Sequence, residues 1–151
     1  MVVTGMKMTE TAAITRRDFA NNSSLSLQLA EDIGAQLSTA IERRGMATLA
    51  LSGGSTPKPL FEALAQLELD WANVVVLQVD ERWVDADHKD SNAALIQQHL
   101  LQGAAANARF VSLKTPADDP FLAASALNEL LAPRSEEHTS ELQSQFRISY
   151  A

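Results

Sequence analysis

The sequence contains no cysteine among its 151 residues, so disulfide bonds and thiolate chemistry are excluded. The three histidines, His88, His99 and His138, do not have the spacing of metal ligands, and we expect neither a metal nor a cofactor. No window approaches the run of about 18 apolar residues that a membrane helix requires, and residues 1–10 lack the apolar stretch of a signal peptide. We therefore expect a cytoplasmic protein that does not associate with a membrane.

Basic residues are also scarce. The chain has 12 lysines and arginines against 19 aspartates and glutamates, a net charge of -7, and a pI near 4.8. This charge argues against general binding to nucleic acid, so a bound phosphate must be held by local donors. The length and the hydrophobic content of 46% fit one globular domain with its own core.

The apolar pattern predicts alternating helices and strands. Helices are expected at 23–44, where apolar residues recur every four positions and Gly45 follows, and at 57–66, 91–101 and 117–131. Strands are expected at 11–15, at 47–51 with burial on both faces, at 74–79 and at 110–113. This alternation predicts an α/β fold with a mainly parallel sheet and helices on both faces.

A glycine-rich turn follows the strand expected at 47–51. Gly53 and Gly54 let the backbone turn sharply and approach a ligand, while Ser52, Ser55 and Thr56 add hydroxyl donors. A helix N-terminus directly after the turn would add the positive end of its dipole, which suits a phosphate monoester. The alternative interpretation is an ordinary strand-to-helix turn, because glycine, serine and proline are common at such turns.

A second polar motif, Asp-Glu-Arg-Trp-Val, follows the strand expected at 74–79. Arg82 can pair with a phosphate through its planar fork of donors, and Asp80 could orient a hydroxyl or transfer a proton. The alternative is a solvated loop after a core strand. Because parallel strands present their carboxyl ends at one edge of the sheet, we expect residues 52–56 and 80–82 to converge there.

Together these motifs form an ordered series that ends in Ser-Asn at the start of a helix, and the series resembles the 6-phosphogluconolactonase family. That family lies in a superfamily with glucosamine-6-phosphate isomerases and deaminases; deaminases typically carry Asp-Glu-Tyr where this chain has Asp-Glu-Arg. The resemblance covers residues 12–133 and implies a Rossmann-like three-layer sandwich of the NagB/RpiA/CoA-transferase-like type, truncated here. The implied site residues are the phosphate cradle Ser52, Gly53, Gly54, Ser55 and Thr56, the substrate-contacting Arg82, and Asp80 as a supporting catalytic carboxylate.

The resemblance implies hydrolysis of 6-phospho-D-glucono-1,5-lactone to 6-phospho-D-gluconate in the pentose phosphate pathway. However, the family's Gly-His-Thr signature, whose histidine is the expected general base, is absent from this sequence. His88 stands in a polar stretch and His99 in a predicted helix, and neither is expected to replace it. We therefore expect the chain to be the N-terminal part of a lactonase and to be inactive by itself.

Residues 134–151 resemble foreign sequence. Residues 134–144 match the in-frame translation of a common high-throughput sequencing adapter, and residues 148–151 match its next constant stretch, with three index codons between them. We therefore expect residues 1–133 to be the N-terminal part of a single domain, and the remainder to add nothing to the fold.

Two other functions fit the same residues: a sugar-phosphate isomerase or deaminase of the same superfamily, and a sugar-phosphate-binding domain without catalysis. In each case the expected partner is a small-molecule sugar phosphate, which is a lactone in the leading hypothesis. The expected assembly is a monomer or a small homo-oligomer.

Overall fold

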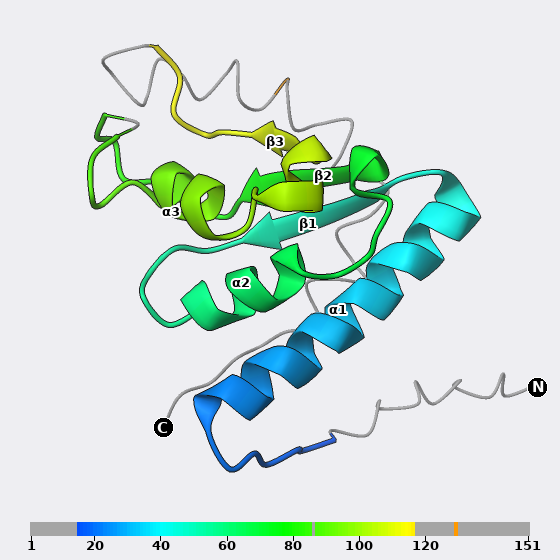
Figure 1. The fold of residues 1–151 in the computed structure, drawn as a ribbon. Helices are drawn as coiled ribbons and strands as arrows, with labels where there is room; N and C mark the ends of the chain where they lie inside the picture. The colour runs from blue at the N-terminus through cyan, green and yellow to red at the C-terminus, as the bar shows by residue number, and fades with distance from the viewer. Residues whose placement is uncertain (1–14, 86, 117–128, 130–151) are drawn as a thin grey trace, which may run out of the picture.

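The computed structural model describes residues 15–85, 87–116 and 129 (Figure 1). The elements follow in the order α1 (Asn22–Arg44), β1 (Ala47–Leu51), α2 (Lys58–Ala65), η1 (Trp71–Asn73), β2 (Val74–Gln78), α3 (Asn92–His99), η2 (Gly103–Asn107) and β3 (Arg109–Val111). This alternation confirms the predicted α/β class.

The described strands form a parallel sheet in the order β1-β2-β3. In the register of the first pair, Ala47 lies opposite Val74, and in the second pair Val75 lies opposite Arg109. All three strands therefore present their carboxyl ends at the same edge, which confirms the predicted parallel arrangement. The turns that follow β1 and β2 both leave the sheet at this edge (Figure 1).

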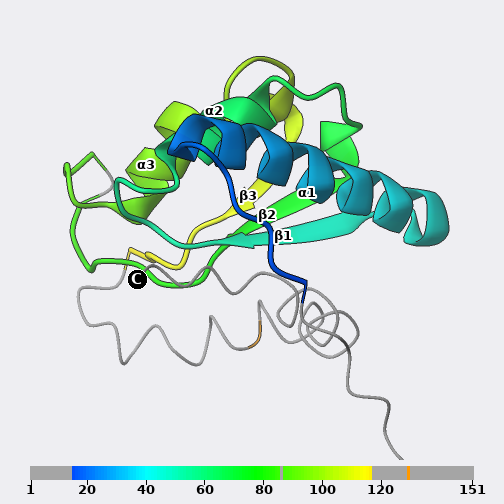
Figure 2. The same ribbon diagram turned by 90° about the horizontal axis from the view of Figure 1, so that it is seen from below.

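Helices α1, α2 and α3 all lie on one face of the sheet (Figure 2). Of the other expected elements, the strand at 11–15 and the helix at 117–131 lie outside the described residues, except for Thr15, which is in no regular element, and Glu129, which is helical. Burial in β1 follows this arrangement. Its alternate residues are buried, but Thr48 is half-buried and Ala50 is exposed, so the prediction of burial on both faces is wrong for β1.

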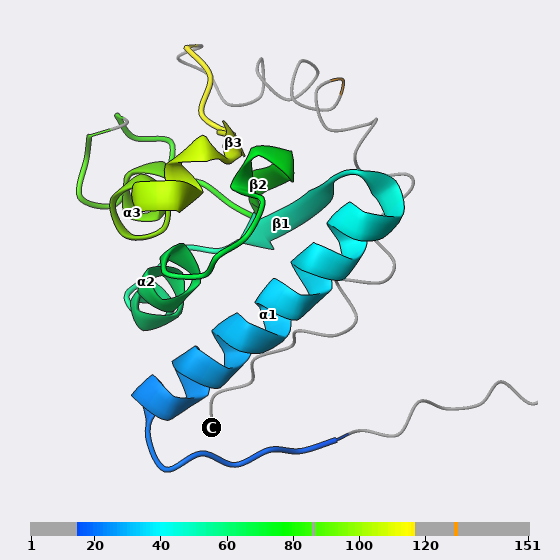
Figure 3. The ribbon, with the colours of Figure 1, turned by 45° about the vertical axis from the view of Figure 1, so that its right-hand side comes forward.

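The core lies between the three helices and the sheet. Its largest fully buried side chains come from every layer of the described fold: Leu37, Phe61, Leu64, Trp71, Val74, Val76, Ile96 and Leu100. Helix α1 borders this core and packs mainly against α2 (Figure 3). Within the described residues, no helix combines the length and apolar character that crossing a membrane demands.

Neighbouring residues define both ends of α1. The Asn21 side chain accepts a hydrogen bond from the backbone N–H of Ser24 at 2.9 Å, which caps the N-terminus. At the other end Gly45 has a φ of 76°, and its backbone N–H donates to the Ile41 carbonyl at 2.7 Å. The left-handed conformation favours glycine, and the predicted helix end at Gly45 is therefore confirmed.

Candidate functional site

The glycine-rich turn connects the carboxyl end of β1 to the N-terminus of α2. Gly54 has a φ of 104°, a conformation that side chains with a Cβ rarely adopt. Ser52, Ser55 and Thr56 are exposed, so their hydroxyls are available to a ligand. Pro57, expected at the first helical position, is instead the N-cap residue, and its carbonyl accepts the backbone N–H of Phe61 at 2.9 Å.

The second predicted motif follows β2 at the same edge. Asp80 and Arg82 are both exposed there, with the half-buried Glu81 between them. The strand itself ends at Gln78, one residue earlier than the sequence predicts, and the backbone N–H of Val79 still donates to the Leu51 carbonyl at 2.9 Å. This last bond ties the end of β2 to the end of β1, directly before the turn.

Asn92, the first residue of α3, connects the two motifs. Its side chain is only 5% exposed and donates from Nδ2 to the Asp80 carbonyl at 3.1 Å. The same side chain lies against Gly53, where an ideal Cβ would stand 1.6 Å from the Asn92 Oδ1. The two predicted motifs therefore meet through Asn92, and the residue at position 53 must lack a side chain while Asn92 holds this place.

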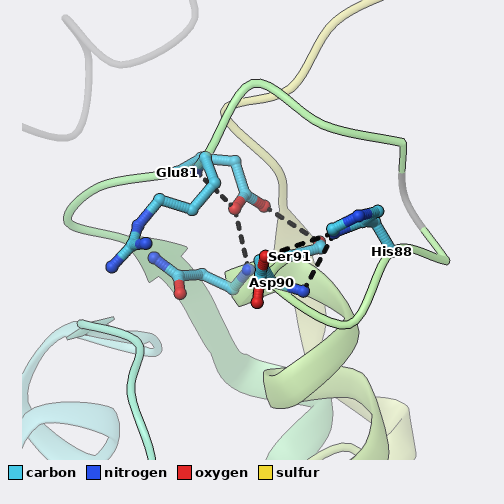
Figure 4. Close-up of polar contacts among 6 residues, drawn as sticks. Glu81, His88, Asp90 and Ser91 are labelled. Atoms are coloured by element: carbon cyan, nitrogen blue, oxygen red, sulfur yellow. Dashed lines mark hydrogen bonds and ion pairs between the residues drawn. The ribbon is translucent and has the colours of Figure 1, made fainter.

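Glu81, to which the sequence motif gives no role, accepts five hydrogen bonds at this edge. Its Oε1 accepts the backbone N–H groups of Asn92 at 2.7 Å and of Arg82 at 2.8 Å. Its Oε2 accepts from the Gln78 side chain at 2.7 Å, from the Ala93 backbone at 2.9 Å and from the Ser91 hydroxyl at 3.3 Å. Figure 4 shows this carboxylate directed at the start of α3.

These contacts also set the charge of Glu81. Partial burial acts to raise the pKa of its carboxyl group. The hydrogen bonds from the Gln78 side chain and from the backbone of Asn92, Ala93 and Arg82 outweigh burial, so the pKa lies below the usual glutamate value. Glu81 is therefore a carboxylate whose negative charge faces the positive end of α3.

Two neighbours complete this hydrogen-bond network. Ser91 is the N-cap of α3, as the sequence predicts, and its hydroxyl accepts the backbone N–H of Ala94 at 3.1 Å. Gln78, which is 5% exposed, accepts the backbone N–H of Leu113 at 2.8 Å on Oε1 while its Nε2 binds Glu81. The sequence does contain a signal for Gln78: it is a polar residue at the end of an apolar strand. A buried side-chain amide at such a place needs hydrogen-bond partners within the protein.

Of the two histidines among the described residues, His88 lies beside the start of α3, where its carbonyl accepts the backbone N–H of Ser91 at 2.9 Å, and His99 lies farther along that helix. His88 is exposed, and its Nδ1 accepts the backbone N–H of Asp90 at 3.1 Å, as Figure 4 shows. His99 lies at the far end of α3, with Nδ1 2.8 Å from the Glu62 carboxylate of α2. The described part of the chain contains no group of three or more histidine, aspartate or glutamate side chains that could hold a metal ion.

The geometry places exposed hydroxyls, a helix N-terminus and the exposed residue Arg82 at one edge of a parallel sheet. A model of the glucosamine-6-phosphate isomerases/6-phosphogluconolactonase family matches residues 20–146. The chain belongs to this family. The match spans most of the chain and includes both predicted motifs, so the predicted resemblance is confirmed.

Members of this family named 6-phosphogluconolactonase are similar to the chain over about half of their length. The Pseudomonas putida protein is 45% identical over 120 residues, which are 80% of this chain and 50% of that protein. The Rhizobium meliloti (strain 1021) protein is 49% identical over 106 residues, 70% of this chain and 46% of its own. The crystal structure of the Shewanella baltica OS155 6-phosphogluconolactonase has a TM-score of 0.74 at 43% identity, covering 76% of this chain and 49% of that one. The chain therefore spans about half the length of the relatives that it matches.

Proposed function

We propose that this chain supplies the phosphate-binding part of a 6-phosphogluconolactonase, which hydrolyses 6-phospho-D-glucono-1,5-lactone to 6-phospho-D-gluconate. The observation that carries the proposal is the contact of Asn92 with both Gly53 and Asp80, because it brings the two polar motifs to one edge of the sheet. The names of the similar proteins support the choice of substrate. Neither motif alone would distinguish this function from a solvated turn.

In this proposal the turn at 52–56 and Arg82 hold the phosphate of the substrate. The backbone N–H groups and hydroxyls of the turn donate to its oxygens, with the N-terminus of α2 behind them, and the Arg82 guanidinium pairs with its charge. The phosphate does not react, so its role is to fix the lactone carbonyl in place. Such positioning can contribute several kcal/mol to the reduction of the barrier.

Asp80 has a supporting part in the proposed chemistry. Its carboxylate is exposed at the end of β2, where it can orient a sugar hydroxyl or the attacking water. The general base that removes a proton from the water is assigned to the Gly-His-Thr signature of the family, which this sequence lacks. Positioning and base catalysis therefore come from different parts of the complete enzyme.

The proposal extends to the organisation and setting of the protein. Residues 1–133 are proposed as the N-terminal part of a single lactonase domain, and residues 134–151 as adapter-derived sequence outside it, although the family match continues to residue 146. The proposed partner is a small sugar-phosphate lactone in the cytoplasm, with no nucleic acid, no cofactor and no metal ion. A monomer or a small homo-oligomer fits this function.

The decisive experiment restores the missing part. Residues 1–133 are joined to the C-terminal half of the Pseudomonas putida relative, and release of 6-phosphogluconate is followed by its coupled oxidation. Because the lactone also hydrolyses in water, the rate is compared with a reaction without protein. The proposal predicts clear acceleration by the chimera and none by the 151-residue chain alone.

The same preparations separate the rival functions. Conversion of glucosamine 6-phosphate by the chimera, without lactone hydrolysis, would assign it to the isomerases and deaminases. Binding of 6-phosphogluconate without acceleration of either reaction would leave a binding domain. Acceleration by the 151-residue chain itself would show that the general base lies within it and that the proposed division of roles is wrong.

A further inference from the structure

Glu81 joins three segments of the chain through one carboxylate. It accepts hydrogen bonds from the side chain of Gln78 in β2, from the backbone of Arg82, and from the start of α3 at Ser91, Asn92 and Ala93. The donors at the start of α3 lie ten to twelve positions along the chain from Glu81. A carboxylate with this set of partners is a tertiary link between the end of β2 and the start of α3.

Capping of α3 does not by itself explain these contacts. Ser91 is already the N-cap, and its hydroxyl accepts the backbone N–H of Ala94. Glu81 takes the N–H groups of Asn92 and Ala93, which the Ser91 hydroxyl leaves without an acceptor within the helix. It also binds the N–H of Arg82, which is outside the helix. One oxygen of Glu81, Oε1, thereby accepts the backbone N–H groups of both Arg82 and Asn92, the first residue of α3.

The link continues from α3 to the phosphate turn. Asn92 carries the backbone N–H that Glu81 accepts, and its side chain fills the space beside Gly53. The guanidinium of Arg82 is exposed, so its location depends on where the backbone of the Asp-Glu-Arg segment is held. The contacts of Glu81 fix that backbone relative to the residue that touches the turn.

We infer that Glu81 is a positioning residue for phosphate binding: its carboxylate holds the Arg82 backbone and the first turn of α3 together, so that Arg82 faces the turn at 52–56. The inference rests on the proposed function of that turn. It assigns Glu81 no contact with the substrate, since its oxygens are already occupied by protein donors. Its effect on binding is exerted through Arg82.

A double-mutant cycle on the full 151-residue chain tests this inference. The probe is 6-phosphogluconate, and its Kd is measured from the amide resonances of Gly53 and Gly54 in the ¹⁵N-labelled protein. We expect Glu81→Gln to weaken binding by roughly five- to tenfold, the size of one lost hydrogen bond. In an Arg82→Ala background the same substitution should change the Kd by less than about twofold.

A merely structural role would not give this dependence on Arg82, because a loosened fold would weaken binding in both backgrounds. Glu68→Gln is the matched control, since it removes the same charge at an exposed position between α2 and η1 and should leave the Kd unchanged. Should Glu81→Gln fail to fold, Glu81→Asp replaces it in the cycle, because it keeps the charge but shortens the reach. The same dependence on Arg82 is expected.

The possible results separate the two proposals. Absence of 6-phosphogluconate binding by the unmodified chain would reject the phosphate site, and the inference with it. Binding that Glu81→Gln leaves intact would reject the inference while the phosphate site stands. Equal losses with and without Arg82 would also reject it, because Glu81 would then act on the fold alone.

Discussion

The side-chain amide of Asn92 occupies the position that a Cβ of residue 53 would need. An ideal Cβ on Gly53 lies 1.6 Å from Oδ1 and 2.1 Å from Cγ of Asn92, far inside van der Waals contact. Asn92 is 5% exposed and its Nδ2 is bonded to the Asp80 carbonyl, so it has little room to move aside. Gly53 therefore allows close packing between the turn and α3, in addition to any approach of a ligand.

Gly53→Ala is expected to destabilise the fold by about 1–3 kcal/mol, the usual cost of overpacking a filled site. The added methyl group must displace Asn92 and break its bond to Asp80. Urea unfolding of the single variants Gly53→Ala and Asn92→Ala and of the double variant measures this. Because Asn92→Ala removes the clash, the loss in the double variant should be smaller than the sum of the single losses. Strict additivity would show that the two residues do not meet.

The lowered pKa of Glu81 predicts how stability depends on pH. Its carboxylate contributes stability above the unfolded value of about 4.3, and the contribution is lost as the pH falls through the folded value. We expect Glu81→Gln to lower the free energy of unfolding by about 1–3 kcal/mol at neutral pH, because the hydrogen bonds that the charged carboxylate accepts are weakened or lost. Its difference from the unmodified chain should then shrink as the pH falls below the unfolded value and through the lower folded value.

Urea unfolding at several pH values checks this expectation. Glu68→Gln, which removes a carboxylate at an exposed position, is the control and should follow the unmodified chain throughout. A difference for Glu81→Gln that stays constant on acidification would mean that its ionisation is not linked to folding.

The sequence predicts those features of the fold and of the site that depend on residues close together in the chain. Ser91 caps α3 through the N–H of Ala94 three positions later, and Gly45 ends α1 through Ile41 four positions earlier, so short patterns identify both. Glu81 in a polar stretch looks like a solvated side chain, because its partners at the start of α3 come near only when the sheet and helices pack. The same holds for Asn92 and its contact with Gly53.

Deletion of residues 134–151 is expected to leave the melting temperature unchanged. Their apolar residues, Leu142, Phe146, Ile148 and Tyr150, are few and irregularly spaced, so they do not form the pattern of a core face. Thermal unfolding followed by circular dichroism compares the 151-residue chain with a chain ending at residue 133. A decrease of several degrees on deletion would contradict a foreign origin of this segment.

Arg82→Ala should weaken the binding of 6-phosphogluconate by about 1.5–3 kcal/mol, the range for a hydrogen bond to a charged group. The chain carries a net charge of -7, so its overall charge does not attract an anionic ligand. The loss should therefore depend on the position of the arginine that is replaced.

Arg109→Ala is the matched control for this prediction. Arg109 is exposed and begins β3, so it lies at the edge of the parallel sheet opposite the turn at 52–56. Its replacement by alanine changes the net charge by the same amount as Arg82→Ala. Titration calorimetry of both variants should show a weaker Kd for Arg82→Ala and an unchanged one for Arg109→Ala. Equal losses in the two variants would indicate long-range electrostatic attraction, and an unchanged Kd for Arg82→Ala would remove Arg82 from the phosphate site.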